Sequence, residues 1–529
     1  MTEDIPSEQN NTSPWRDLFS AVVDETASDE QQQALNRLLN DSPQAVDEYL
    51  AYIDLHAALS APSMIARTLE QSSSGNDSVQ RANLSTRRWP RRIALGGVVG
   101  LLIAITLFLG LPPRHAGVVL IRNVGADVRY GNKPANVGAA LGSRICEFQF
   151  GMVELESPSG VQMVIEGPAR FSFRSPVSLI LYEGRLTADV PPQGVGFRVE
   201  TPRMEVVDLG TRFGVDVDSD GVSEVHVFQG EVVAKGNTET QSTKLLKGDA
   251  GRVSETGNFG SRSFRNAAFI HKPELSDLAV GIESGQRRHW QHAIQTIKDD
   301  PSLIACLHFD QANSQHAIHG GRKVQGRFPG VTAIEFVNPD DHIRFLADGV
   351  FEELTMMTWV RLDLSPTGEN SLFHTDNWNR DGQVHWLVSD KSQMRFSLHR
   401  GDRDPYRHLP VSIWPESTQN IIQSVGRWVH LAASYQASRQ AIRFYINGQF
   451  DNEVIDPVIK QAILSPAQIG NWDSGELPYP NRRLCGRLDE FIVLGRVMSD
   501  EEITRFHNAG SPYLKTVNSA SPSSNQNVQ

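Results

Sequence analysis

The chain has 529 residues, and a single hydrophobic core rarely exceeds roughly 250–300 residues, so two or three domains are expected. A formal net charge of −12 excludes a generally basic protein, and no direct nucleic-acid partner is expected. Three cysteines are too few for a disulfide-built scaffold or a four-thiolate zinc site.

Residues 1–60 form an acidic segment with the apolar spacing of short helices. Residues 1–80 hold 14 acidic and 3 basic side chains, so most of the net charge lies here. Three helix-start signals precede apolar stripes, namely Ser13-Pro14, Ser28 with Gln31, and Ser42-Pro43. The segment is interpreted either as a solvated acidic tail or as a docking module for a basic partner. Residues 61–92 have the composition of a linker.

Residues 93–111 predict a transmembrane helix. The run IALGGVVGLLIAITLFLGL has no charged residue, and 19 residues in a helix span most of a hydrocarbon layer roughly 30 Å thick. Five arginines between Arg81 and Arg92 precede it, whereas only Arg114 follows closely. Because positive charge stays on the cytoplasmic side, we expect a single-pass protein of the inner membrane. The N-terminus would lie in the cytoplasm and the C-terminal bulk in the periplasm.

Residues 117–255 have a sequence pattern typical of an all-β domain. Alternating apolar residues such as Phe213, Val215 and Val217 are interrupted by turn residues every 8–12 positions. Gly210 and Gly230 stand where a bend or a bulge is needed.

Four motifs of this region together resemble a FecR domain: IEGPARFSF, FRVETP, VVDLGTRFGVDV and EVHVFQGEVVA. The resemblance implies a membrane-anchored regulator that carries an outside signal to a cytoplasmic sigma factor. Residues 29–59 likewise resemble the anti-sigma segment of single-pass regulators of planctomycete type, without the zinc-binding H-x3-C-x2-C. Asp208, Thr211 and Arg212 are interpreted as a buried polar triplet that shapes a turn.

Residues 256–300 predict a connector with a short amphipathic helix through Trp290, Ile294 and Ile297. Residues 301–512 predict a second all-β domain of two packed sheets, a jelly roll. Within it, Asn447-Gly448 predicts a type I′ hairpin turn. Residues 513–529 are rich in Ser, Asn and Gln and predict a disordered tail.

The motifs MTWVRL, RWVHLAASYQASRQAIRFYINGQ and GRLDEFIVLGRVMSDEEI resemble a concanavalin-A-like domain of the laminin-G type. The resemblance implies a lectin-like β-sandwich that binds glycans or proteins, and some relatives are glycosidases. It also implies that Cys306 and Cys485 lie near each other at the first and last strands, which would allow a disulfide. Calcium is a candidate ligand in this fold, with Asp310, Asp376, Asp473 and Asp489 as candidate donors.

Sugar binding uses exposed aromatic rings, and three tryptophans in loop-like sequence are the candidates: Trp378, Trp414 and Trp472. Catalysis is not expected, and no catalytic residue is assigned. A retaining glycosidase needs two carboxyl groups roughly 5 Å apart, and the E-x-D-x-x-E pattern is missing from the sequence. Asp489 and Glu490 are adjacent in a predicted strand and should point to opposite faces.

The whole sequence therefore predicts a mainly β membrane regulator of anti-sigma type. Residues 1–60 would hold a sigma factor or similar regulator, and the far domain would bind a glycan or protein outside. A surface-binding adhesion protein without signalling output and a membrane-tethered glycosidase remain the alternatives. No cofactor other than calcium is expected.

Overall fold

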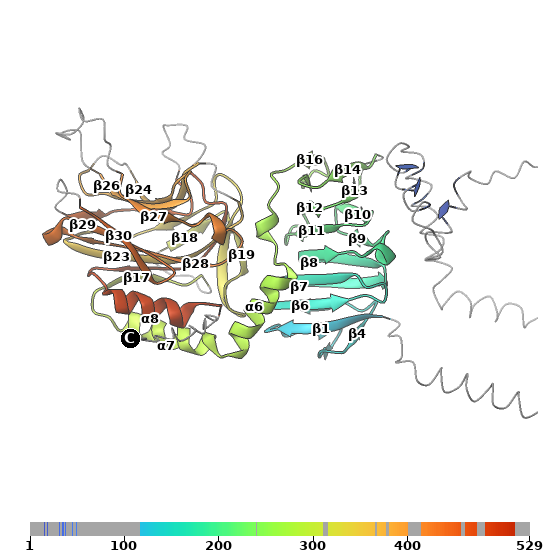
Figure 1. Cartoon of the computed structure of the whole chain (residues 1–529), viewed down its shortest axis with the longest axis horizontal. Coiled ribbons are helices and arrows are strands. Elements are labelled where there is room, and N and C mark those ends of the chain that lie inside the picture. Colours follow the sequence, from blue (N-terminus) through green and yellow to red (C-terminus); the bar gives the residue numbers. More distant parts are fainter. Residues whose placement is uncertain are drawn as a thin grey trace, which may run out of the picture.

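The computed structural model describes residues 117–513 except 240, 310–315, 365–367, 377–379, 400–413, 456–460 and 473–481. It also describes ten residues of the first 50: Trp15, Leu18, Phe19, Gln31, Ala34, Leu35, Arg37, Leu38, Ala45 and Tyr49. Two β bodies lie side by side, and helices α6 (Lys272–Glu283) and α7 (Gln286–Lys298) connect them along one edge (Figure 1). The mainly β fold class is thus confirmed for the described part of the chain.

The first β body is one 16-stranded sheet. Its strands are β1 (Val118–Val124), β2 (Arg129–Tyr130), β3 (Lys133–Pro134), β4 (Ala140–Leu141), β5 (Cys146–Phe148), β6 (Met152–Glu156), β7 (Gln162–Ser175), β8 (Ser178–Asp189), β9 (Arg198–Glu200), β10 (Met204–Asp208), β11 (Arg212–Val217), β12 (Ser223–Gln229), β13 (Glu231–Gly236), β14 (Thr243–Leu246), β15 (Ala250–Val253) and β16 (Phe259–Ser261). The two long strands β7 and β8 pair with each other at the centre of the sheet. Strand β8 also pairs antiparallel with β11 and parallel with β9.

The sheet encloses its own hydrophobic core because alternate residues of each strand point inward. Phe213, Val215 and Val217 all belong to this core, as the alternation predicts. The glycine at position 230 is required by geometry. Its φ is +78°, and a Cβ there would lie 2.6 Å from Cγ2 of Thr211.

The connector begins with a 3-10 turn (Asn266–Ala268) and continues as α6 and α7. Helix α6 buries Leu275 and Leu278 against Val124, Met152 and Val164 of the first β body. Helix α7 buries the predicted stripe of Trp290, Ile294 and Ile297 in a cluster with the second body. The apolar faces of the two connector helices therefore pack on different domains.

The second β body is a sandwich of an 8-stranded and a 7-stranded sheet, with a small two-stranded sheet beside it. Its strands are β17 (Leu303–Leu307), β18 (His316–His319), β19 (Arg322–Gln325), β20 (Thr332–Phe336), β21 (His342–Phe345), β22 (Gly349–Phe351), β23 (Glu353–Leu362), β24 (Asn370–Thr375), β25 (Val384–Val388), β26 (Gln393–Leu398), β27 (Glu416–Asn420), β28 (Val429–Gln436), β29 (Ala441–Ile446), β30 (Gln449–Ile455), β31 (Ala462–Leu464), β32 (Ala467–Ile469) and β33 (Gly486–Leu494). The seven-stranded sheet has the order β18-β21-β32-β24-β25-β26-β27.

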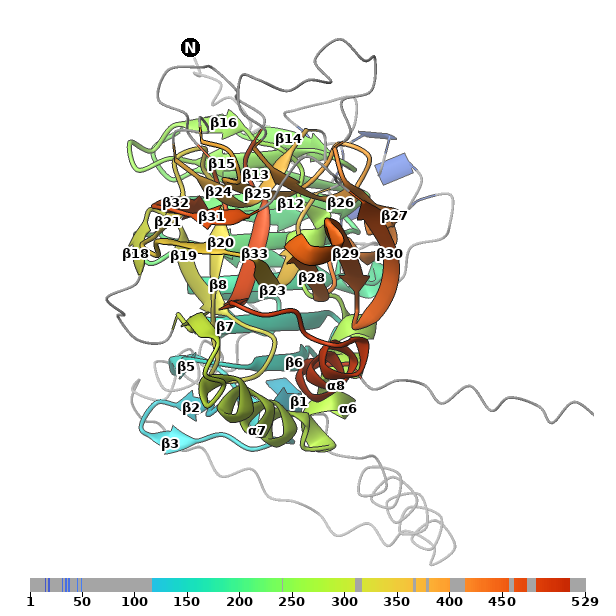
Figure 2. The ribbon, with the colours of Figure 1, turned by 90° about the vertical axis from the view of Figure 1, so that its left-hand side faces the viewer.

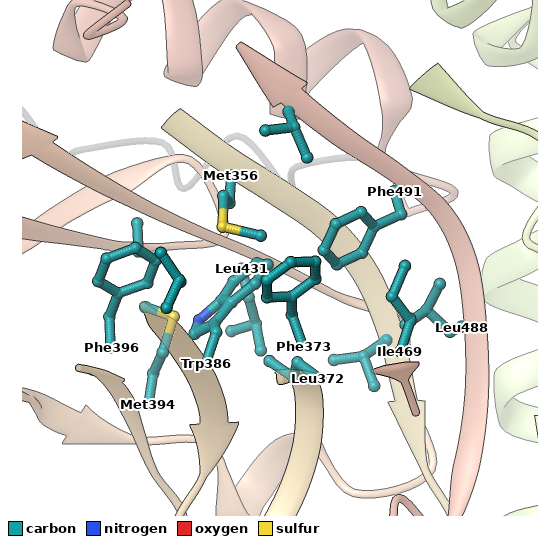
Figure 3. Close-up of a cluster of buried hydrophobic side chains, with 14 of the residues drawn as sticks. Met356, Leu372, Phe373, Trp386, Met394, Phe396, Leu431, Ile469, Leu488 and Phe491 are labelled. Carbon is teal, nitrogen blue, oxygen red and sulfur yellow. The ribbon is translucent and has the colours of Figure 1, made fainter. Parts of the chain in front are cut away.

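Large apolar side chains from both sheets fill the space between them. Figure 3 shows Met356, Leu431 and Phe491 from one sheet meeting Phe373 and Trp386 from the other. The rings of Phe373 and Phe491 stack at a centroid distance of 5.8 Å. This is the packing expected of a jelly roll.

One local prediction in this domain is confirmed, and a helix cap accompanies it. Asn447 and Gly448 have φ values of 51° and 73° between paired Ile446 and Gln449, as a type I′ hairpin requires. Helix α8 (Asp500–Gly510) begins with a capping box between Ser499 and Glu502. Figure 2 shows α8 beside α7, below the sandwich.

The N-terminal and membrane-spanning predictions fall largely outside the described residues. Residues 93–111 are not among them, and within the described part no helix has the length and apolarity needed to cross a bilayer. The nine described residues of the first 50 other than Trp15 are helical. Phe19, Leu35, Ala45 and Tyr49 form a small buried cluster that also contacts Leu209.

Candidate functional site

A row of polar side chains crosses the seven-stranded sheet. Strand register places Arg344 beside Gln468, Gln468 beside His374, His374 beside His385, and His385 beside Ser397. The residues that alternate with them, such as Phe373 and Trp386, point into the core. The polar row (Arg344, Gln468, His374, His385 and Ser397) therefore lies on the sheet face opposite the core.

The centre of the polar row is a pair of buried histidines. The ring centroids of His374 and His385 are 4.0 Å apart, and the Ser371 hydroxyl lies 2.6 Å from Nδ1 of His374. Burial lowers the pKa of both imidazoles well below its ordinary value. Both rings are therefore neutral at pH 7, so each offers one hydrogen-bond donor and one acceptor.

Two polar atoms of this row have no hydrogen-bond partner among the described residues, although both are buried. They are Nε2 of His374 and the hydroxyl of Ser397. Buried polar groups in folded proteins nearly always have a partner, so unused hydrogen-bonding capacity is unusual. Comparable atoms occur elsewhere in the described residues, for example at His430 and Ser434 on β28, so the polar row is the candidate ligand-binding surface only together with the charged and aromatic groups at its border.

Charged and aromatic groups border the polar row. At one end Arg344 binds Asp376 at 2.8 Å, and next to the other end Arg395 binds Glu369 and Glu416, each at 2.6 Å. The guanidinium of Arg395 also lies 5.7 Å from the ring centroid of Trp414. Trp414 is 49% exposed, which leaves ring surface for a ligand.

The three tryptophans predicted to bind sugar have different surroundings. Trp414 is exposed, whereas Trp378 lies outside the described residues. Trp472 is only 9% exposed, which favours a packing role for its ring. Its ring stacks on His374 at 5.4 Å, and the Arg482 guanidinium lies 4.6 Å from its centroid. Packing against these neighbours explains why Trp472 has little free ring surface.

The two calcium candidates that the structure describes, Asp376 and Asp489, are engaged with different arginines. Asp376 is paired with Arg344, and Asp489 accepts a hydrogen bond of 2.9 Å from the backbone N–H of Arg327. Asp310 and Asp473 lie outside the described residues. Within the described part of the chain, no three acidic, histidine or cysteine side chains are grouped as metal ligands.

The prediction that Asp489 and Glu490 point to opposite faces is wrong, because a β-bulge interrupts the strand. Thr358 pairs with Phe491 and Trp359 with Asp489, so Glu490 is the extra residue, with a φ of 69°. The bulge turns both carboxylates toward Arg327, which binds Asp489 at 3.2 Å and also binds Glu490. The two carboxylates are thus engaged in a buried ion pair inside the domain.

The predicted disulfide between Cys306 and Cys485 is contradicted, since all three cysteines are free thiols. Cys306 pairs with Ile492 on β33, whereas Cys485 directly precedes the first residue of that strand. At about 3.3 Å per residue, the two α-carbons lie roughly 20 Å apart, well beyond disulfide reach. Burial raises the pKa of each of these two thiols to about 12.

The FecR-like motif forms a buried corner at the end of β10, as the sequence indicates. Asp208 is fully buried and accepts hydrogen bonds from the Thr211 hydroxyl and, at 2.7 Å, from the Gly210 N–H. Burial raises the pKa of Asp208 to about 7. Arg212 is exposed, so only two members of the predicted triplet are buried.

Comparison with known families identifies both β bodies. Residues 152–233 match the FecR protein family, and residues 338–504 match the concanavalin A-like lectin/glucanases superfamily of laminin-G type. No match is found among curated proteins.

Similar solved structures include domain 4 of AbnA, a GH43 extracellular arabinanase from Geobacillus stearothermophilus, in complex with arabinotriose. It has a TM-score of 0.29 and 17% identity, over 39% of this chain and 98% of that one. The binding domain of Paraclostridial Mosquitocidal Protein 1 has a TM-score of 0.32 and 16% identity, over 39% of this chain and 52% of that one. A protein described as an anti-sigma factor from Parabacteroides distasonis has a TM-score of 0.21 and 19% identity, over 23% of this chain and 59% of that one.

The chain spans about half of the mosquitocidal protein's binding domain and more than half of the Parabacteroides protein. The two family matches agree with the two β bodies seen in the structure. The chain therefore contains one region similar to the FecR protein family and a second, C-terminal region similar to the concanavalin A-like lectin/glucanases superfamily.

Proposed function

We propose that this protein is a single-pass membrane regulator that relays ligand binding outside the cytoplasm to a cytoplasmic sigma factor. The observation that carries the proposal is the presence of a FecR domain and a lectin-like domain in one chain. A domain of a signalling family and a domain of a ligand-binding family are the two parts that such a relay needs.

The inner part of the proposed relay is the acidic segment 1–60. Its described residues are helical apart from Trp15, and Phe19, Leu35, Ala45 and Tyr49 are buried together. A segment of about 60 residues can form only a small core. So small a core favours stabilisation by a partner. The negative charge favours a basic surface on that partner. A sigma factor is the partner that the FecR family match supports.

The outer part is the polar row with Trp414 at its border. The exposed ring of Trp414 can stack on a sugar, whereas Nε2 of His374 and Oγ of Ser397 are buried and can bond a ligand hydroxyl group only if the side chains that cover them move. These groups support a glycan ligand over a purely apolar one. Arg344 and Arg395 are already neutralised by carboxylates, so no strong selection for an anionic ligand is expected.

The proposed membrane topology is tested in cells. Protease added to intact spheroplasts should remove epitopes placed after residue 513 and spare an epitope at the N-terminus. In the structure, Leu209 of the FecR domain contacts the N-terminal cluster of Phe19, Leu35, Ala45 and Tyr49. A bilayer spanned by residues 93–111 would place Leu209 and this cluster on opposite sides, so the contact and the proposed topology exclude each other. An N-terminal epitope that is cleaved in intact spheroplasts would therefore refute the topology.

The regulatory function is tested by affinity capture of the full chain from detergent-solubilised membranes. Recovery of a sigma factor with the wild type, and its loss when residues 1–60 are deleted, is the expected result. A glycan array with the same preparation tests the outer site. Glycan binding without a sigma factor would instead favour the adhesion protein.

A further inference from the structure

The two β domains meet through a buried network of charged side chains. Arg185 on β8 donates a hydrogen bond of 2.8 Å to Asp216 on β11, and bonds of 2.8 and 2.9 Å to Glu335 on β20 of the other domain. Arg322 on β19 binds the same two carboxylates, at 2.7 Å to Asp216 and 2.6 Å to Glu335. We call these four residues the junction cluster.

Further ion pairs cross the junction beside this cluster. Arg487 on β33 makes a two-pronged contact with Glu166 on β7, and its second bond is 3.0 Å long. Arg265 of the connector binds Glu224 of the FecR domain at 2.9 Å and Asp363 of the jelly roll at 3.1 Å. Every carboxylate named in these contacts is at most 8% exposed.

Within the junction cluster each arginine binds one carboxylate of its own domain and one of the other domain. Burial alone would raise the pKa of Glu335, but Arg185 and the neighbouring arginines hold the pKa below its ordinary value. A buried ion pair adds little net stability, yet the loss of one partner is costly because the other charge stays buried. Such pairs strongly disfavour any rearrangement that separates the two domains.

Two other contacts fix the same arrangement. The backbone carbonyl of Ala268 in the connector accepts hydrogen bonds from Arg185 at 2.9 Å and from Arg487 at 3.0 Å. Tyr513, the last described residue, lies between two charged side chains. The Arg427 guanidinium is 4.0 Å from the centroid of its ring, and its hydroxyl donates a hydrogen bond of 3.3 Å to Glu274 on α6.

An open cleft of about 540 Å³ adjoins the network, so the polar contacts occupy only part of the junction.

We infer that the FecR domain and the lectin-like domain form one rigid signalling body, held by the junction cluster, with no hinge between them. A ligand that binds the jelly roll then affects the FecR domain by changing the position of both domains together. The signalling role rests on the proposed function, whereas the rigid connection stands on the contacts alone.

Calorimetry of the full chain in detergent tests the rigid connection, whether or not a sigma factor binds. The wild type should show one unfolding transition for both β domains. Glu335→Gln leaves Arg185 and Arg322 facing each other over one remaining carboxylate. It should split the transition in two, with the lower one shifted down on the order of 10 °C.

The matched control is Glu490→Gln, which breaks the buried pair with Arg327 inside the jelly roll and leaves the junction intact. This variant should lower the temperature of a single transition without splitting it. Two resolved transitions in the wild type, or no splitting in Glu335→Gln, would overturn the inference.

If Glu335→Gln does not fold, hydrogen exchange of the wild type tests whether the junction is rigid. Amides of α6 should exchange as slowly as those of β7, and rapid exchange of α6 would refute a rigid junction.

Discussion

The buried corner at Asp208 should make the stability of the protein fall as the pH rises from about 4 to 7. Asp208 is fully buried at the end of β10, and burial raises its pKa from 3.8 to about 7. In this pH range the folded protein retains a proton that the unfolded chain has lost. The free energy of unfolding therefore decreases with rising pH through this window and becomes constant above it.

The size of the effect follows from the size of the pKa difference. A difference of about three pH units, at about 1.4 kcal/mol per unit, sets a ceiling of about 4 kcal/mol. Asp208→Asn removes the titration but keeps one acceptor for the Gly210 N–H or the Thr211 hydroxyl. Relative to the wild type, the variant should therefore gain stability between pH 5 and pH 8.

Urea unfolding of the full chain in detergent at pH 5 and pH 8 measures this gain. Asp220→Asn, at an exposed position of the turn at the other end of β11, is the control and should leave the pH dependence unchanged. If the wild type and Asp208→Asn lost the same stability between the two pH values, the buried carboxyl could not be the cause. The same result would show that Asp208 is ionised in the folded protein.

Three further results are expected. Phe491→Ala should destabilise the jelly roll by about 3–5 kcal/mol in chemical denaturation, because the ring is fully buried, whereas Phe450→Ala, at a 43% exposed ring, should have little effect. Trp414→Ala should weaken glycan-array binding without lowering the melting temperature, whereas Trp472→Ala should lower the melting temperature. Equal melting temperatures would contradict the packing described for Trp472. Thiol titration of the unfolded, non-reduced protein should find all three cysteines free, and a count of one would restore the disulfide.

Local sequence patterns determined the β architecture of this protein. Alternation of Phe213, Val215 and Val217 places them in one core, and Asn447-Gly448 specifies a hairpin. Ser499 and Glu502 likewise specify the start of α8. Strand alternation, turn chemistry and helix capping depend on neighbours within a few residues, so the order of the amino acids is sufficient to predict them.

Contacts between distant segments were decided only by the tertiary structure. Arg185 and Glu335, or Arg487 and Glu166, are far apart in the chain, and each looks in sequence like an ordinary charged residue of a strand. The bulge at Glu490 depends on pairing between β23 and β33, which no local pattern reports. The polar row likewise arises from five strands whose register is set by the sandwich core. Burial and cross-strand neighbours follow from packing, and packing is a property of the whole fold.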